Sequence, residues 1–350
     1  MNLRVAPLLI GIFIVLPISA EAFSSFELYG GAYHKRITEE ALSRFEFADE
    51  PLHYLNQGLL EPDKFYREEF TEPKHHFTAE HFQASLDYLR NKRQFVLDCA
   101  EGAPDDYQQY RRALFALGEY LHAVQDFYSH TNWVERAVVD GRQEIPLASF
   151  DSLATSSLVS PYFLYQSLPP KEITDTDAYV RAFEKPFYEQ AELEAMSDEQ
   201  RVLSATNPEK SFTHHSLAKD NPDYPQSSVV WRRGGSTLFE LAYDVAVRDT
   251  RRQWPALRES IWDAYPERGA SIAEVLRGGW AGDLPSGDGA ASLKVTTATV
   301  STWTIWDSAS TNTTLIRSGL DNATRRGRSG SVSNGVPVSF AASSGCLASG

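Results

Sequence analysis

Residues 117–135 read LGEYLHAVQDFYSHTNWVE, and this stretch organises the rest of the chain. It places His122, Asp126 and His130 four residues apart. In an α-helix of about 100° per residue, a step of four turns the side chain by only about 40°, so all three project from one stripe. Imidazole and carboxylate groups on one stripe are a set of side chains that can hold a metal ion.

Two interpretations of this stripe are open from its own residues. A separate apolar face consists of Leu114, Leu117, Leu121, Val124 and Tyr128, so the His/Asp stripe could be the solvated side of the helix. Solvated faces, however, are usually built from Glu, Lys, Gln and Arg, whereas His is a common zinc ligand. A metal site needs further ligands from other segments.

Other segments do contain matching blocks. LHAVQDFYSHTN (121–132) is followed by THHSLAKD (213–220), and preceded by YHKRITEEAL (33–42), EPDKF (61–65) and KHHFT (74–78). Together these blocks resemble the zinc-dependent phospholipase C and P1 nuclease superfamily, over about residues 23–255. The H-x3-D-x3-H-x-N spacing is most similar to the fungal heterokaryon-incompatibility Het-C proteins and their bacterial relatives.

The resemblance implies an all-α, multi-helix bundle that holds two or three zinc ions. One zinc would be bound by Asp63, His76, His122 and Asp126. Asp126 would bridge to a second, held by His34 and by the N-terminal amine and carbonyl of Phe23, and a third would take His130 and His214. Asp63 is also the expected catalytic residue, which orients or deprotonates the attacking water.

The sequence departs from the family in two places. His130 follows His122 after eight residues, as in the Het-C pattern, and not after ten as in bacterial phospholipases C and P1 nucleases. Those enzymes also have a carboxylate four residues after the position of His214, where this chain has Ala218. Asp220 is the expected replacement, Asp244 is an alternative, and an incomplete third site is another.

The remaining histidines allow a choice. His76 is preferred over its neighbour His75 because the family's ligand is likewise followed by Phe and a small polar residue. His53, His75 and His81 are expected at the surface, given their polar neighbours.

The first 22 residues have the composition of a secretory signal peptide. Arg4 precedes an apolar run, and Ala20-Glu21-Ala22 forms a small-x-small cleavage site before Phe23. The apolar run is too short to read best as a membrane span. We therefore expect a secreted or periplasmic protein whose cleavage exposes the Phe23 amine.

Composition limits the partners. The 350 residues carry a formal net charge of −14, which argues against tight capture of long nucleic acid or anionic bilayers. Bound zinc would nevertheless place positive charge where a phosphate must go. The two cysteines, Cys99 and Cys346, allow one disulfide.

The pattern predicts one helical domain over residues 23–280. Helices are expected over 38–47, 79–99, 105–139, 175–203 and from a Thr237/Glu240 capping box to about Trp254, with loops over 56–77 and 147–170. Residues 281–350 are rich in Ser, Thr and Gly, and are expected to be a short extension with one or two strands or no stable fold.

The chemistry with residues to support it is metal-dependent hydrolysis, because the chain has no G-x-S-x-G elbow, no P-loop and no Cys nucleophile with a partner His. The first expectation is a phospholipase C-type zinc phosphodiesterase that acts on phospholipid or another phosphodiester, with transient membrane-surface contact and no stable nucleic-acid partner. A P1-type single-strand nuclease and a non-catalytic Het-C-like recognition protein are the alternatives.

Overall fold

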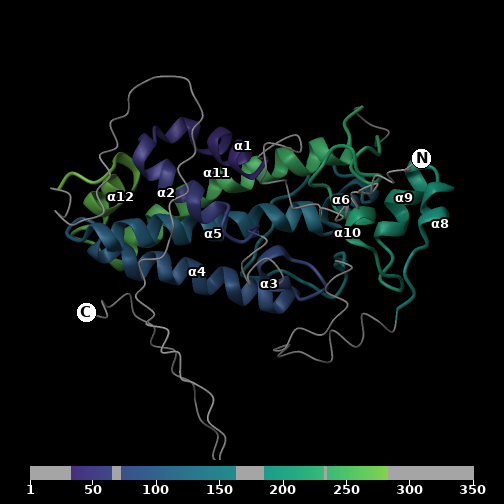
Figure 1. Cartoon of the computed structure of the whole chain (residues 1–350), viewed down its shortest axis with the longest axis horizontal. Coiled ribbons are helices and arrows are strands. Elements are labelled where there is room, and N and C mark those ends of the chain that lie inside the picture. The colour runs from purple at the N-terminus through teal and green to yellow at the C-terminus, as the bar shows by residue number, and fades with distance from the viewer. Residues whose placement is uncertain (1–32, 65–71, 163–184, 232–234, 283–350) are drawn as a thin grey trace, which may run out of the picture. The chain divides into compact units, whose positions relative to one another are not determined.

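Helix α5 (Tyr107–His130) lies at the centre of the fold (Figure 1). The computed structural model describes residues 33–64, 72–162, 185–231 and 235–282, and they form the expected all-α fold. The Asp106 side chain caps the start of α5 by accepting hydrogen bonds from the amides of Gln108 and Gln109. From Ala116 to His130 every residue is buried. The polar stripe of α5 is therefore not its solvated side.

The other helices surround α5 or pack on its neighbours. In chain order they are α1 (Tyr33–Leu42), the 3-10 helix η2 (Ser43–Phe45), α2 (Asp49–Leu59), α3 (Pro73–His76), α4 (Phe82–Gly102), α6 (Trp133–Val139), α8 (Gln190–Glu194), α9 (Asp198–Ala205), α10 (His214–Leu217), α11 (Leu238–Ala264) and α12 (Gly269–Gly278). Helices α2, α4 and α11 pack directly on α5, and α1 packs on α11. None of the described helices is long and apolar enough to cross a membrane.

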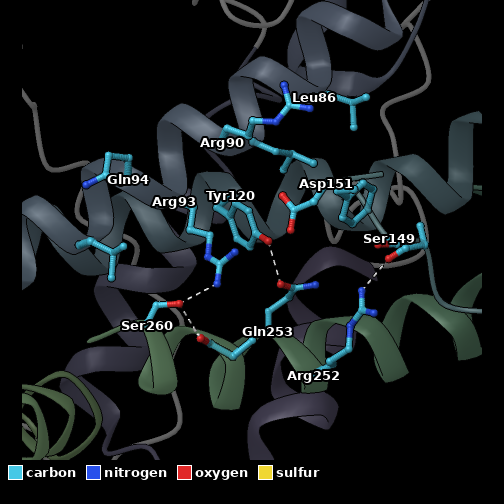
Figure 2. A pocket seen from close by; sticks show the side chains of 15 residues that line it. Leu86, Arg90, Arg93, Gln94, Tyr120, Ser149, Asp151, Arg252, Gln253 and Ser260 are labelled. Atoms are coloured by element: carbon cyan, nitrogen blue, oxygen red, sulfur yellow. Dashed lines mark hydrogen bonds between the residues drawn. The ribbon is translucent and has the colours of Figure 1, made fainter. Parts of the chain in front are cut away.

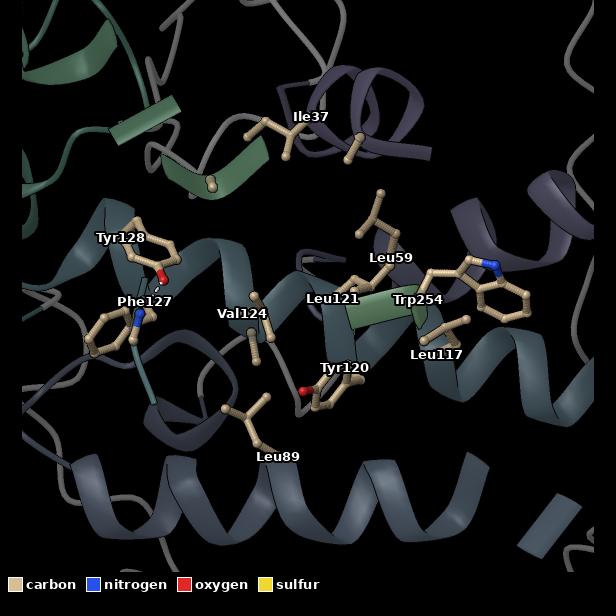
Figure 3. Close-up of a cluster of buried hydrophobic side chains, with 14 of the residues drawn as sticks. Ile37, Leu59, Leu89, Leu117, Tyr120, Leu121, Val124, Phe127, Tyr128 and Trp254 are labelled. Atoms are coloured by element: carbon tan, nitrogen blue, oxygen red, sulfur yellow. Dashed lines mark hydrogen bonds between the residues drawn. The ribbon is translucent and has the colours of Figure 1, made fainter. Parts of the chain in front are cut away.

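One hydrophobic core joins these helices (Figure 3). Leu117, Leu121 and Val124 of α5 meet Leu89 of α4 and Trp254 of α11 in it. The apolar face of α5 predicted from the sequence is thus a core face.

Helices α2 and α5 approach each other closely through two facing glycines. A Cβ atom at Gly58 would overlap the carbonyl oxygen of Phe115, and one at Gly118 would overlap that of Leu55. Only glycine leaves room for this backbone approach. The contact places the end of α2 directly against the α5 turn that precedes His122.

The predicted single helix over 105–139 is wrong, because the chain breaks between α5 and α6. Thr131 is extended and its hydroxyl donates a 2.7 Å hydrogen bond to the carbonyl of Phe127. The side chain of Asn132 bonds to the Ala205 carbonyl and the Val159 amide, each at 3.0 Å. Such side-chain bonds compete with the helical ladder, and here they end it.

Other boundaries also differ from the predictions. Helix α4 starts at Phe82 and not at residue 79, because Ala79 and Glu80 have positive φ angles of 53° and 58°. Helix α2 and the short α3 occupy parts of the predicted 56–77 loop, and α1 starts at Tyr33, before residue 38. Within the described part of 175–203, the helix is interrupted between α8 and α9.

Helix α11 begins as predicted and ends later. Both halves of the capping box are present between Thr237 and Glu240. The helix continues past Trp254 and through the exposed Pro255, because Leu257 and Ile261 extend its buried apolar face.

Several predicted features lie outside the described residues: the leader, Phe23, Cys346 and the 281–350 extension apart from its first two residues. Cys99 is buried. Where the chain is described, extended segments form isolated bridges and no sheet, and one of them pairs Tyr162 with Thr213 in parallel.

Replacing Gly118 with Ala should destabilise the fold, although Gly→Ala inside a helix is ordinarily favourable by roughly 1 kcal/mol. The new methyl group would force α2 and α5 apart, so we expect the free energy of unfolding to fall by about 1–3 kcal/mol in urea titrations.

Gly102→Ala is the matched control, because the three atoms nearest to its Cβ would all belong to the flexible side chain of Gln109. Equal stabilities of the two variants would contradict the role of the glycine contact.

Candidate metal centre

Asp126 is the centre of the first cluster of polar side chains. Its carboxylate lies 3.0 Å from Nε2 of His122, 2.9 Å from Nδ1 of His76 and 3.2 Å from Nε2 of His34. Asp126, His122 and His34 are fully buried, and His76 is 2% exposed. Three imidazoles from three helices therefore meet one carboxylate in the protein interior.

Asp63 completes this first cluster from the turn that follows α2. Its carboxylate oxygens lie 3.6 Å from Nε2 of His122 and 3.8 Å from both Nε2 of His34 and Nδ1 of His76. Only 2% of Asp63 is exposed. The turn residue thus faces the same three imidazoles as Asp126.

A second cluster consists of His130, His214 and Asp220. The Nε2 atoms of the two histidines are 3.0 Å apart, and Oδ2 of Asp220 lies 3.1 Å from His214 and 3.5 Å from His130. His130 Nδ1 lies 3.9 Å from the carboxylate of Asp126. The two clusters are therefore neighbours along α5.

Hydrogen bonds to main-chain carbonyls fix which nitrogen of His122 and His130 can bind an ion. Nδ1 of His122 lies 2.9 Å from the carbonyl oxygen of Leu59, and Nδ1 of His130 lies 2.6 Å from that of His76. A carbonyl oxygen only accepts, so Nδ1 carries the proton and the neutral ring presents the lone pair of Nε2. Both Nε2 atoms face the clusters.

Gln125 likewise fixes which nitrogen of His34 can bind an ion. Its amide nitrogen donates to the hydroxyls of Thr38 and Thr250 at 2.9 and 3.2 Å, which leaves Oε1 to accept a 2.7 Å bond from His34 Nδ1. Nε2 of neutral His34 then carries a lone pair towards Asp126. Such outer partners are typical of metal-ligating histidines.

Both central carboxylates are ionised at neutral pH. Burial by itself raises the pKa of Asp126, but the surrounding imidazoles, His122 foremost, hold that pKa well below its usual value. Burial also opposes ionisation of Asp220, yet His214 and then His130 lower its pKa to about 2. A buried carboxylate needs a compensating cation.

The pKa values of four imidazoles shift in two directions, and these are the rings of His34, His122, His130 and His214. Burial disfavours the charged form of all four, and it keeps the pKa of His122 and of His214 below the usual value. The charge of Asp126 reverses this for His34 and His130, whose pKa values are raised. Each cluster thus pairs an imidazole that favours a proton with one that favours its neutral form.

Buried polar atoms without a hydrogen-bond partner are a further reason why these residues fit a metal ion. Nε2 of His76 and Oδ1 of Asp220 are buried and have no hydrogen-bond partner among the described residues. Lone pairs of imidazole and carboxylate face one another at 3.0–3.2 Å, an arrangement that only a proton or a metal ion between them can stabilise. Three groups, His34/Asp63/His122, His76/His122/Asp126 and His130/His214/Asp220, have the spacing to hold an ion.

A buried ion pair positions the second cluster. Nζ of Lys219 lies 3.0 Å from the carboxylate of Glu135 and donates to the carbonyl of Thr131 at 2.9 Å, and both charged residues are fully buried. The Lys219 amide also donates to the Ser129 carbonyl at 3.0 Å. The 213–220 block is thereby fixed against the α5–α6 junction.

The structure brings together eight of the nine predicted site residues: His34, Asp63, His76, His122 and Asp126 in one cluster, and His130, His214 and Asp220 in the other. The ninth, Phe23, lies outside the described residues. Asp244 is exposed and pairs with Arg248 at 2.9 Å, so Asp220 is the carboxylate beside His214.

His75 differs from its expected surface position. It is 6% exposed, and its ring packs on that of Tyr88 with centroids 4.4 Å apart. His53 is exposed, as expected, and His81 is partly buried. None of these three contributes to the ion-sized groups of the described residues.

Sequence reasoning missed Gln125, Lys219 and Glu135. Gln125 lies among apolar residues of a helix that is buried on every side, and this could have marked it as a bonded interior amide. The pairing of Lys219 with Glu135 joins residues 84 positions apart and has no local signal.

Comparison with known families gave one match. Residues 63–157 are similar to the family described as the VWA7 N-terminal domain. This range includes Asp63, His76 and the α5 stripe but not His34, His214 or Asp220. Comparisons with curated proteins and with solved structures found no match to the chain.

Lys219→Met should leave the Glu135 side chain in the interior without its cationic partner, and we expect the free energy of unfolding to fall by about 3–5 kcal/mol in denaturant titrations. The matched control is Lys35→Met, which removes an exposed pair with Glu39 and should cost less than about 1 kcal/mol. Similar small losses from both variants would contradict the structural role of Lys219.

The adjacent histidines 214 and 215 offer a direct test of metal binding. His214 belongs to the second cluster, whereas His215 is exposed and packs beside Tyr224. We expect the wild-type protein to retain two or three zinc ions per chain after dialysis, His214→Ala to lose one and His215→Ala to lose none, measured by elemental analysis. Identical zinc contents in variants of equal helix content would refute the second site.

Proposed function

We propose that this chain is a secreted zinc-dependent phosphodiesterase of phospholipase C type, which hydrolyses the phosphate ester of a phospholipid. One observation carries the proposal: eight buried imidazole and carboxylate side chains converge in two adjacent clusters with their lone pairs facing each other. The resemblance of the sequence blocks to the zinc-dependent phospholipase C and P1 nuclease superfamily supports the same chemistry.

The donor set favours zinc. Every candidate ligand among the described residues is a histidine or an aspartate, which suits zinc, and the His-rich composition disfavours calcium or magnesium. Zinc, when bound, supplies an acidified water, a binding site for phosphoryl oxygens and stabilisation of the leaving alkoxide.

The residues of the chain have separate tasks in this proposal. His34, His76 and His122 hold the first ion or ions together with Asp63 and Asp126. The carbonyl of Leu59 and Gln125 keep the rings of His122 and His34 in the binding tautomer. Asp63 lies at the edge of the cluster, 3.6–3.8 Å from the imidazoles. It is therefore the group best placed to orient a water and accept its proton.

The choice of lipid over nucleic acid rests on charge. A formal net charge of −14 repels long polyanions. A nuclease and a recognition protein without turnover are the competing outcomes of the experiment below.

Phosphocholine release from phosphatidylcholine vesicles, measured beside cleavage of single-stranded DNA with and without a chelator, tests the proposal. We expect chelator-sensitive release of phosphocholine and little DNA cleavage. Asp63→Asn should lower turnover by about 10²–10⁴-fold, as expected for loss of a general base, while exposed Asp105→Asn should not change it.

Preferred cleavage of DNA would make the chain a nuclease. Zinc bound without hydrolysis of either substrate would favour the recognition protein and refute the enzyme.

A further inference from the structure

A cavity of about 530 Å³ lies away from the candidate metal centre. Its walls come from α4, α5, the segment 148–151 and α11 (Figure 2). Tyr120 of α5 lines it, and His122 lies two residues further, about 200° around the helix. The cavity therefore opens on the face of α5 opposite to the His/Asp stripe, and none of the clustered residues lines it.

The charged residues of the lining are Arg90, Arg93, Asp151 and Arg252. Arg90 pairs with Asp87 at 2.5 Å, and Arg252 pairs with the buried Asp249 at 2.7 Å. Arg93 and Asp151 have no ion-pair partner among the described residues. The two lining charges without an ion-pair partner thus have opposite signs.

Arg93 is held in place by a neutral partner. Its Nη2 donates a 2.7 Å hydrogen bond to Oγ of Ser260, which in turn donates to the carbonyl of Ala256 at 2.9 Å. The other N–H groups of the guanidinium remain available to donate hydrogen bonds to an anionic group. Figure 2 shows Arg93 and Asp151 on two sides of Tyr120.

The polar side chains that lie between Arg93 and Asp151 already have hydrogen-bond partners. The Tyr120 hydroxyl donates to Oε1 of Gln253 at 2.7 Å, and Nε2 of Gln253 donates to Asp249 at 2.6 Å. A ligand need not compensate these groups. The charged ends of the ligand would therefore bind to Arg93 and Asp151.

Phe150 lies beside Asp151 in the lining. Its ring packs edge-on against Phe127, with centroids 5.2 Å apart, so it is fixed by the core. A carboxylate beside an aromatic ring is suited to an ammonium or quaternary ammonium group. The anionic end of a ligand would then lie at Arg93 and the cationic end at Asp151 and Phe150.

We propose that this cavity binds a small zwitterion, with its anionic group on Arg93 and its ammonium group between Asp151 and Phe150. Two sources share this chemistry: amino-acid-like carboxylates and phosphate-bearing head groups. The site is independent of the proposed phosphodiesterase activity, because it uses no residue of the candidate metal centre.

Calorimetric titration of the full chain tests the proposal with two zwitterions, glycine betaine and phosphocholine, and two singly charged probes, choline and inorganic phosphate. At least one zwitterion should bind ten-fold or more tightly than either singly charged probe. A preference for glycine betaine identifies the carboxylate source, and a preference for phosphocholine identifies the phosphate source.

Arg93→Gln and Asp151→Asn should each weaken zwitterion binding by at least ten-fold. Arg258→Gln is the matched control, because Arg258 stacks over Trp262 at 4.9 Å and does not line the cavity, so binding should be unchanged. Circular dichroism of each variant verifies the fold.

Three results would overturn the proposal. They are zwitterions that bind no tighter than choline or phosphate, Arg93 and Asp151 variants that bind as the wild type does, and binding that disappears in His122→Ala. The last result would place the ligand at the metal centre. Failure of phosphatidylcholine hydrolysis, in contrast, leaves this titration unaffected.

Discussion

The buried carboxylate of Asp126 is the constraint on which the surrounding structure depends. It sits in a helix that is covered on all sides, so water cannot compensate its charge. The side chains around it are His34 of α1, His76 of α3 and His122 of α5 itself, and a proton or a metal ion between these imidazoles and the carboxylate compensates the charge. The arrangement of the N-terminal half around α5 follows from this need. A fold that left any of these segments elsewhere would leave an ionised carboxylate in an apolar interior.

Main-chain groups give the centre its rigidity. The glycine contact between α2 and α5 brings the Leu59 carbonyl to Nδ1 of His122, and thereby selects the tautomer of that ring. His76 acts twice: its imidazole belongs to the first cluster, whereas its carbonyl orients His130 in the second. The left-handed conformation of Phe77, with φ of 50°, turns the chain directly after it. His76 therefore links the two clusters in addition to the approach of His130 to Asp126 along α5, and displacement of α3 would disturb both.

The sequence predicted those features that a local pattern determines. The α5 stripe follows from four-residue spacing, and the start of α11 follows from the capping box at Thr237. The break at Thr131 could not be predicted, because it depends on bonds from Asn132 to residues far along the chain. The choice of Asp220 over Asp244 had the same origin, since only the packing of the 213–220 block brings a carboxylate to His214. The resemblance supplied candidate residues, and tertiary structure decided among them.

Holding so many polar groups in the interior has an energetic consequence. Desolvating a carboxylate costs several kcal/mol even after the protein relaxes, whereas a buried Leu or Val contributes about 1.5–3 kcal/mol. The apolar face of α5, with Leu117, Leu121 and Val124 in the core, offsets the polar stripe on the same helix. Ion binding would add to this balance, because an ion that binds only the folded chain stabilises it by mass action. In the proposed zinc protein, the stability of the fold and the occupancy of the centre are therefore expected to rise together.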